Sequence, residues 1–124
     1  MQDRGWWLGA ALSGAVVVIA GAFGAHALEG QLAPRLAAAF ETGVRYQAWH
    51  TLALLAVLAW RASHPLAGQR LAMALWAAGM ALFAGSLYAM ALSGATGLGM
   101  VTPVGGVLMI GGWLALAGAI LRAR

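Results

Sequence analysis

Four long apolar runs constrain the fold of this chain more than any other feature. They cover roughly residues 6–28, 42–60, 71–92 and 102–121. Each run holds about 20 residues, enough for an α-helix to cross a hydrocarbon core of about 30 Å. The runs are rich in Ala and Leu and lack a strict polar–apolar alternation, which favours helices over strands. The sequence therefore predicts four transmembrane helices.

Composition indicates that lipid rather than water surrounds these runs. Of the 124 residues, 63% are hydrophobic and only 8% are charged, whereas soluble domains carry about 25% charged residues. A soluble fold of this length could not hide so much apolar surface. We predict an all-α membrane protein, a four-helix transmembrane bundle that forms a single domain over residues 1–124.

The end of the first run has the small-x-small form of a signal-peptide cleavage site, Ala25-His26-Ala27. However, the apolar stretch before it is about 20 residues long, and the corresponding region of a signal peptide spans about 7–15 residues. An acidic residue, Asp3, also stands beside Arg4 ahead of the run. We therefore expect the first helix to be retained.

The connection between the first two runs has a helical pattern of its own. Leu32, Leu36 and Phe40 recur every four residues, which predicts a short amphipathic helix lying in the membrane interface. The later connections are short. One contains the breaker His64-Pro65, and the other, over residues 93–101, is Gly-rich and uncharged.

The placement of the arginines, which are the only basic residues apart from histidine, gives an orientation. Five fall at one end of the predicted bundle and two at the other: Arg4, Arg61, Arg70, Arg122 and Arg124 against Arg35 and Arg45. The positive-inside rule then predicts a multi-pass protein with both termini in the cytoplasm. Arginines at the ends of apolar runs are typical topology signals, so we expect no nucleic-acid partner.

Small residues recur every four positions within the runs, as in Ala10 and Gly14 or in Ala81, Gly85 and Ala89. This spacing lets helix backbones approach closely. We interpret it as packing within the bundle, and a seam between copies of the chain is the alternative.

Polar side chains gather in the outer half of the predicted bundle. In the second run, Arg45, Tyr46 and His50 share one helical face, and Glu41 precedes Arg45 by one turn. Ionisable groups inside a membrane are costly and usually face the protein interior or a water-filled cavity. The candidate binding residues are His26, Glu41, Arg45, Tyr46, Gln47, His50, Ser86 and Tyr88.

We predict that Arg45, Tyr46 and His50 point inward and meet His26 or the segment from Ser86 to Tyr88. Two interpretations of such a network stay open. Interhelical hydrogen bonds also hold membrane bundles together, at about 0.6 kcal/mol each. The same groups would equally form a site for a ligand, a lipid or a proton.

The residue types limit the chemistry of this cluster. Cysteine is absent, which excludes thiolate sites and disulfides. A haem held by His26 and His50 is chemically feasible, while a zinc site would have only Glu41 as a third ligand. No hydrolase triad, P-loop or dinucleotide-binding fingerprint is present. We therefore expect no catalytic residues, no metal and no cofactor.

Four motifs, in order along the chain, resemble those of one family. They are GAFGAHAL at residues 21–28, FETGVRYQ at 40–47 followed by His50, GSLY at 85–88 and TPVGG at 102–106. On these motifs the chain is identified as a member of the YgdD/YwdK-like family of small bacterial inner-membrane proteins, known as domain of unknown function 423. Transmembrane protein 256 looks like a eukaryotic relative. The resemblance implies a four-helix protein of the bacterial inner membrane, with no established activity and no catalytic residues to carry over.

Three functions are compatible with the sequence. The first is a non-enzymatic accessory protein that binds membrane lipid, a larger membrane complex or a second copy of itself. The second is a small oligomeric transporter, channel or proton-relay unit that uses the His, Tyr and Arg cluster. The third is a haem- or quinone-linked redox protein. We favour the first, because the chain has extensive small-residue surfaces and no catalytic constellation.

Overall fold

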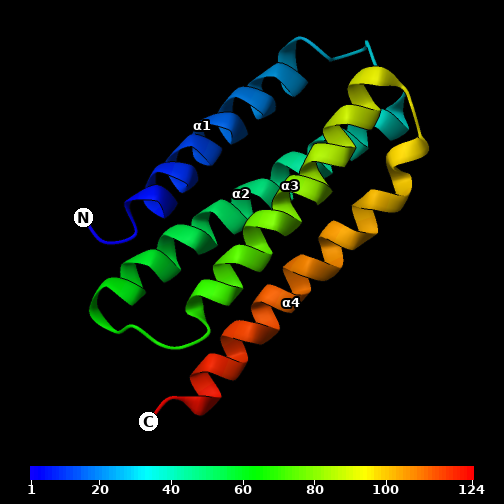
Figure 1. Ribbon diagram of the computed structural model, residues 1–124. Coiled ribbons are helices and arrows are strands. Elements are labelled where there is room, and N and C mark those ends of the chain that lie inside the picture. The colour runs from blue at the N-terminus through cyan, green and yellow to red at the C-terminus, as the bar shows by residue number, and fades with distance from the viewer.

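The computed structural model describes residues 1–124 and contains four α-helices and no strand. The helices are α1 (Arg4–His26), α2 (Pro34–Ser63), α3 (Gln69–Ser93) and α4 (Val101–Arg122), with a short 3₁₀-helix, η1 (Gly97–Met100), before α4. Successive helices run in opposite directions, and both termini lie at the same end of the molecule (Figure 1). The all-helical fold predicted from the apolar runs is confirmed.

Three stretches are long and apolar enough to cross a membrane: α1, α3 and the continuous stretch Gly97–Arg122. The helix α2 is less apolar, because it carries Arg35, Glu41 and Arg45 in its first half. Many large apolar side chains face outward, including Leu12 and Ile19 of α1. Such a surface fits lipid as its surroundings.

The predicted interfacial helix is not a separate element. Residues 34–41 are the first two turns of α2, which continues without a break to Ser63. Pro34 occupies the first helical turn, where a missing N–H costs nothing, so it starts the helix instead of interrupting it. Phe40 is buried, and its ring lies so close to Gly24 of α1 that an added Cβ there would be 2.9 Å from Phe40 Cε1. The apolar side of this segment therefore packs partly against α1.

The helix backbones pack in chain order: α1 on α2, α2 on α3, and α3 on α4. The backbone of α1 approaches no helix other than α2. The core lies between α2, α3 and α4, with Leu58, Met73 and Trp76 almost fully buried. Only Ala10 of α1 is buried. The first helix, α1, therefore lies beside a core formed by α2, α3 and α4 and does not close a compact bundle.

The closest approach of two backbones is between α3 and α4, and glycine makes it possible. A Cβ added to Gly105 would lie 2.4 Å from the backbone nitrogen of Phe83 and 2.8 Å from the carbonyl oxygen of Gly79. At Gly112 it would lie 2.4 Å from Trp76 Cδ1. None of the glycines in this contact belongs to the four-residue repeats that were predicted to pack, and Ala81 and Gly85 of those repeats face α1 instead of α4.

A buried carboxylate joins the start of α1 to the adjoining ends of α2 and α3. Asp3 accepts hydrogen bonds from Arg61 Nε at 2.7 Å and from Arg70 Nη2 at 3.0 Å, and its side chain is 5% exposed. The hydrogen bond from Arg61 is the main reason that the pKa of Asp3 lies below its usual value. We call this the Asp3 clamp. It places the beginnings of α1 and α3 at the same end of the molecule.

Candidate functional site

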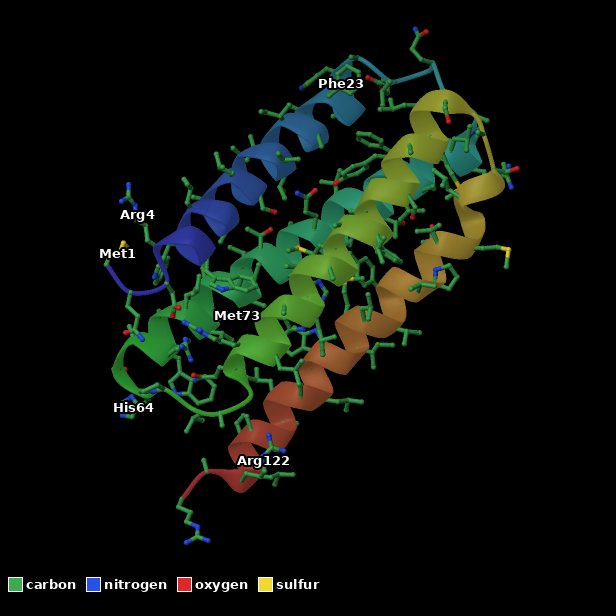
Figure 2. The ribbon with its side chains drawn as sticks, viewed as in Figure 1. Met1, Arg4, Phe23, His64, Met73 and Arg122 are labelled. Atoms are coloured by element: carbon green, nitrogen blue, oxygen red, sulfur yellow. The ribbon has the colours of Figure 1, made fainter.

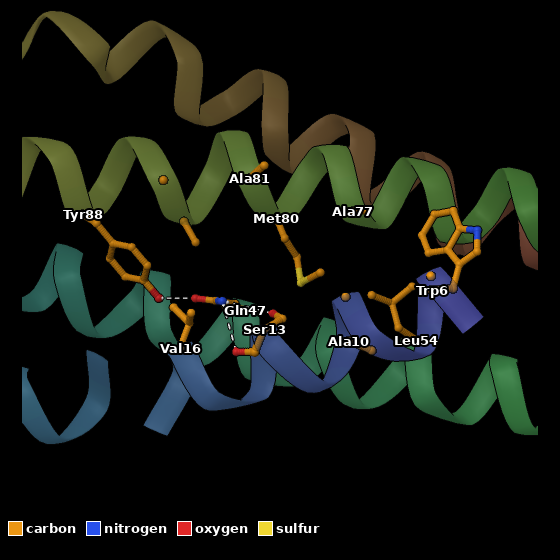
Figure 3. Close-up of a pocket in the computed structure, with 14 residues that line it drawn as sticks. Trp6, Ala10, Ser13, Val16, Gln47, Leu54, Ala77, Met80, Ala81 and Tyr88 are labelled. Carbon is orange, nitrogen blue, oxygen red and sulfur yellow. Dashed lines mark hydrogen bonds between the residues drawn. The ribbon is translucent and has the colours of Figure 1, made fainter. Parts of the chain in front are cut away.

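The main cavity is a groove between α1 and α3, with α2 as its floor. Figure 3 shows α1 and α3 on opposite sides of it, with side chains of all three helices directed between them. Its volume is about 590 Å³, within the range of typical small-molecule sites. We call it the α1–α3 groove. Its lining residues are Gly5, Trp6, Gly9, Ala10, Ser13 and Val16 of α1, Gln47 and Leu54 of α2, and Ala77, Met80, Ala81, Ala84, Gly85 and Tyr88 of α3.

The walls of the groove contain several glycines at positions where no other part of the chain packs closely. A Cβ added to Gly5, Gly9 or Gly85 would meet no atom within 4 Å. By contrast, the glycines of the α3–α4 contact have no such room. The lining contains no charged residue. The groove is therefore an apolar space that a further molecule can enter without displacing side chains.

One hydrogen-bonded line of side chains crosses the floor of the groove. Tyr88 donates to Gln47 Oε1 at 2.7 Å, and Gln47 Nε2 donates to Ser13 Oγ at 3.1 Å and to the Ser13 carbonyl at 3.4 Å. Ser13 Oγ is 2.7 Å from Thr51 Oγ1, which is 3.8 Å from Met80 Sδ. We call Tyr88, Gln47, Ser13 and Thr51 the polar row. Figure 3 shows the first three meeting in the groove.

The polar row runs from the middle of the molecule toward the end away from the termini. Ser13 follows Arg4 by nine residues, which is about 14 Å along α1 at a rise of about 1.5 Å per residue, whereas Tyr88 precedes the end of α3 at Ser93 by five residues, or about 8 Å. A hydrocarbon core of about 30 Å would therefore place Ser13 near its middle and Tyr88 in the half away from the termini. Tyr88 is held there by close packing on α2, since a Cβ at Gly43 would lie 2.8 Å from Tyr88 Cε1.

His50 is buried in a second, separate polar contact. Its Nδ1 lies 2.8 Å from the carbonyl oxygen of Tyr46, so Nδ1 must carry the proton. Its Nε2 then accepts a hydrogen bond from Trp113 Nε1 of α4 at 3.0 Å. Both ring nitrogens are satisfied in the neutral imidazole. The rings of Trp76 and Trp113 pack edge-on against it, and Trp76 Nε1 is buried with no hydrogen-bond partner.

The structure divides the predicted candidate residues instead of gathering them in one cluster. Gln47 and Tyr88 meet across α2 and α3, although the prediction had assigned Arg45, Tyr46 and His50 to the Tyr88 segment. His50 faces the interior, but its partner is Trp113 and not His26. His26 is exposed at the end of α1 and makes no side-chain hydrogen bond. No three His, Asp or Glu side chains come together as metal ligands would.

The remaining candidates have other surroundings. Arg45 was predicted to face inward, and this is wrong: its side chain is 50% exposed and pairs with exposed Glu41 at 3.1 Å. Arg45 lies in the first half of α2, near enough to the end of the molecule for its long side chain to reach water. Tyr46 is half-buried, with its ring 5.0 Å from that of Phe83. Ser86 is buried against α4, where it bonds Thr102.

Sequence reasoning missed several residues that the structure brings into these contacts. Ser13 and Thr51 complete the polar row, and their polarity within long apolar runs was the available signal. Trp113 gave no signal, because a tryptophan in a membrane helix is ordinarily read as an interfacial side chain. Glu41 also lines a second groove of about 530 Å³, between the end of α1 and the start of α2.

Comparison with known proteins places the chain in a family. The profile of the family described as "Protein of unknown function (DUF423)" matches residues 20–106. A "UPF0382 membrane protein" of Haemophilus influenzae is 43% identical over 92% of this chain and 91% of its own length. The "UPF0382 inner membrane protein YgdD" of Escherichia coli is 41% identical over 100% of this chain and 95% of its own length.

A "UPF0382 membrane protein" of Staphylococcus epidermidis is 38% identical over 90% of this chain and 91% of its own length. No solved structure matches the chain. The relatives carry names that state a membrane location and no activity, which agrees with the resemblance seen in the four motifs and with the three apolar helices. By sequence this chain therefore belongs to the DUF423 family of membrane proteins of unknown function.

Proposed function

We propose that this protein is a non-enzymatic accessory protein of the inner membrane that binds the apolar chain of a membrane lipid in the α1–α3 groove. The observation that carries the proposal is the groove itself: about 590 Å³ of space, lined mostly by apolar residues and glycine and by no charged residue. Beside Gly9 and Gly85 there is space that no side chain of this protein fills. An unfilled apolar space forfeits dispersion contacts, so a flexible chain entering it is stabilised.

The surroundings of the groove favour lipid as its occupant. Large apolar side chains next to it, such as Leu8 and Leu12, face outward, so lipid chains are the molecules present at highest concentration at its opening. A helix of a larger complex or of a second copy is the competing occupant, because the four-residue spacing of Ala77, Ala81 and Gly85 also admits a helix backbone. The experiment below distinguishes the two.

We further propose that all four helices cross the membrane, with both termini in the cytoplasm. The Asp3 clamp supports this, because it holds the starts of α1 and α3 at the same end of the molecule. The helix α2, which connects them, must therefore run in the opposite direction. Five of the seven arginines lie at the clamp end. The helix α2 has 30 residues and is about 45 Å long, which is longer than the hydrocarbon core. The first turns of α2, which carry Arg35 and Glu41, therefore lie at the interface.

A transporter, a proton relay or a haem protein is less well supported. The two ring nitrogens of His50 are already occupied by Tyr46 and Trp113, and the ring lines neither of the two grooves described above. His26 lies at the end of α1, away from these contacts. No observation therefore favours chemistry that runs through the two histidines.

Blocking the groove tests the proposal. Ala81 and Ala78 are both exposed on α3, but only Ala81 lines the groove. Ala81→Leu should reduce the lipid that stays bound to the purified protein after extensive detergent washing, as measured by native mass spectrometry, while Ala78→Leu should not. Equal lipid retention by wild type and both variants would contradict the proposal. A second protein chain lost only from Ala81→Leu would identify a helix as the occupant instead.

A further inference from the structure

The hydrogen bonds of the polar row fix the direction in which each group donates. Gln47 has one nitrogen and one oxygen at the end of its side chain, and a carbonyl oxygen can only accept. Because the amide approaches the Ser13 carbonyl at 3.4 Å, the group on that side must be Nε2. Oε1 therefore faces Tyr88, and the Tyr88 hydroxyl must be the donor of the 2.7 Å bond.

The same reasoning extends along the rest of the row. Ser13 Oγ receives a hydrogen from Gln47 Nε2, and its own hydrogen is directed to Thr51 Oγ1 at 2.7 Å. The Thr51 hydroxyl then points its hydrogen at Met80 Sδ. The hydroxyl hydrogens of Tyr88, Ser13 and Thr51 are therefore all used within the protein. Tyr88 Oη and Gln47 Oε1, whose residues line the groove, each keep a lone pair that can accept a further hydrogen bond.

We infer that the ligand of the α1–α3 groove is an uncharged lipophile that carries a hydroxyl group, which donates a hydrogen bond to Tyr88 Oη or Gln47 Oε1. The inference rests on the proposed function and adds the chemical class of the occupant. The lining has no charged residue to neutralise a charged ligand group, and Gln47 lies well inside the predicted membrane span, 13 residues after the start of α2. A long-chain alcohol represents this class.

This arrangement discriminates against molecules that bring only acceptors. The ester carbonyls of an ordinary diacyl lipid, or an ether oxygen, would gain no hydrogen bond from the oxygens of Tyr88 and Gln47, which can only accept. Such molecules can fill the groove with their chains but cannot pair with these two oxygens. A neutral hydrogen bond typically adds about 0.5–1.5 kcal/mol, so a hydroxyl should raise affinity about three- to tenfold over a matched ether.

The test compares dodecanol with methyl undecyl ether, which has the same number of heavy atoms but no hydroxyl hydrogen. Binding is measured as the partition of each radiolabelled probe into nanodiscs that hold the full-length protein, relative to empty nanodiscs. Wild type should prefer the alcohol about three- to tenfold. In Gln47→Leu, the Tyr88 hydroxyl hydrogen loses its acceptor and becomes free to donate. Alcohol and ether oxygens can both accept it, so the preference should fall toward one.

The outcomes separate this inference from the proposed function. Equal binding of both probes by wild type would overturn the inference and leave groove binding intact. If neither probe binds above the empty nanodiscs, both the inference and the proposed function fail. Ser86→Ala is the matched control, because it removes a buried hydroxyl of α3 that faces Thr102 and lies outside the groove. This variant should keep the wild-type preference. Since the wild-type comparison requires no substitution, a folding defect in Gln47→Leu would not weaken it.

Discussion

Substituting Gly105 with alanine probes the closest helix contact in the molecule. The new Cβ would lie 2.4 Å from Phe83 N, 2.8 Å from Gly79 O and 2.9 Å from Phe83 Cα. All three are backbone atoms, which cannot rotate aside, and carbon atoms pack comfortably only at about 3.5–4.0 Å. The two helices would have to separate by about 1 Å along much of their length. Overpacking of this kind typically costs about 1–3 kcal/mol.

The neighbouring glycine provides the control. A Cβ at Gly106 would be 3.8 Å from Phe83 Cδ2, an ordinary contact. Alanine is favoured over glycine by about 1 kcal/mol within a helix, so Gly106→Ala should be neutral or stabilising. Gly105→Ala gains the same helix propensity, so its net loss should be about 0–2 kcal/mol, which leaves it about 1–3 kcal/mol less stable than Gly106→Ala. Unfolding by sodium dodecyl sulfate, followed by circular dichroism, measures both. A Gly105→Ala variant as stable as Gly106→Ala would refute the packing of α3 on α4 described above.

Three further predictions concern the clamp, the buried histidine and the topology. Asp3→Asn should lower the free energy of unfolding at neutral pH. Because the pKa of Asp3 is lowered in the folded protein, the difference in stability between wild type and variant should persist down to about pH 4 and vanish as the pH falls through that lowered pKa. Chemical unfolding at several pH values measures this difference. Trp113→Phe should lower the free energy of unfolding by about 1–3 kcal/mol, because it leaves the buried His50 Nε2 without a hydrogen-bond donor. The control Trp49→Phe, which removes no hydrogen bond, should lower it by less. Ser63→Cys and Ala95→Cys should be labelled from opposite sides of the membrane by an impermeant thiol reagent, and labelling from one side would exclude the proposed topology.

The elements of the fold could be predicted from the sequence because each depends on local pattern. The apolar runs mark the four helices, and His64-Pro65 marks the end of α2. The start of α2 was misplaced, because the segment with Leu36 and Phe40 was predicted to be a separate interfacial helix, although Pro34 occupies the first turn of α2. Whether a helix continues past a polar segment such as Glu41-Thr42 depends on contacts with another helix, here Phe40 on Gly24, which sequence spacing does not reveal.

The candidate site could be predicted only in part. Gln47 and Tyr88 were identified because polar groups in apolar runs need partners, and the structure joins them. Which partner each group finds depends on helix rotation, and a sequence gives depth along a helix but not rotation about it. His50 was therefore assigned to His26 or to the segment from Ser86 to Tyr88, although the rotation of α4 brings Trp113 to it. The groove had no signature in the sequence, because Gly9 lines an open space while Gly105 permits a close contact.

The proposed function depends on the α1–α3 groove, which lies along α1 between Arg4 and Phe23, the two residues of this helix that Figure 2 labels. The most direct test is a high-resolution structure of the wild-type protein in a lipid nanodisc. We expect elongated density that belongs to no part of the chain, running between Gly9 and Ala81 and ending with a polar group beside Gln47 and Tyr88. A structure in which α1 packs directly on α3, so that Gly9 and Ala81 touch and no space remains between them, would contradict it.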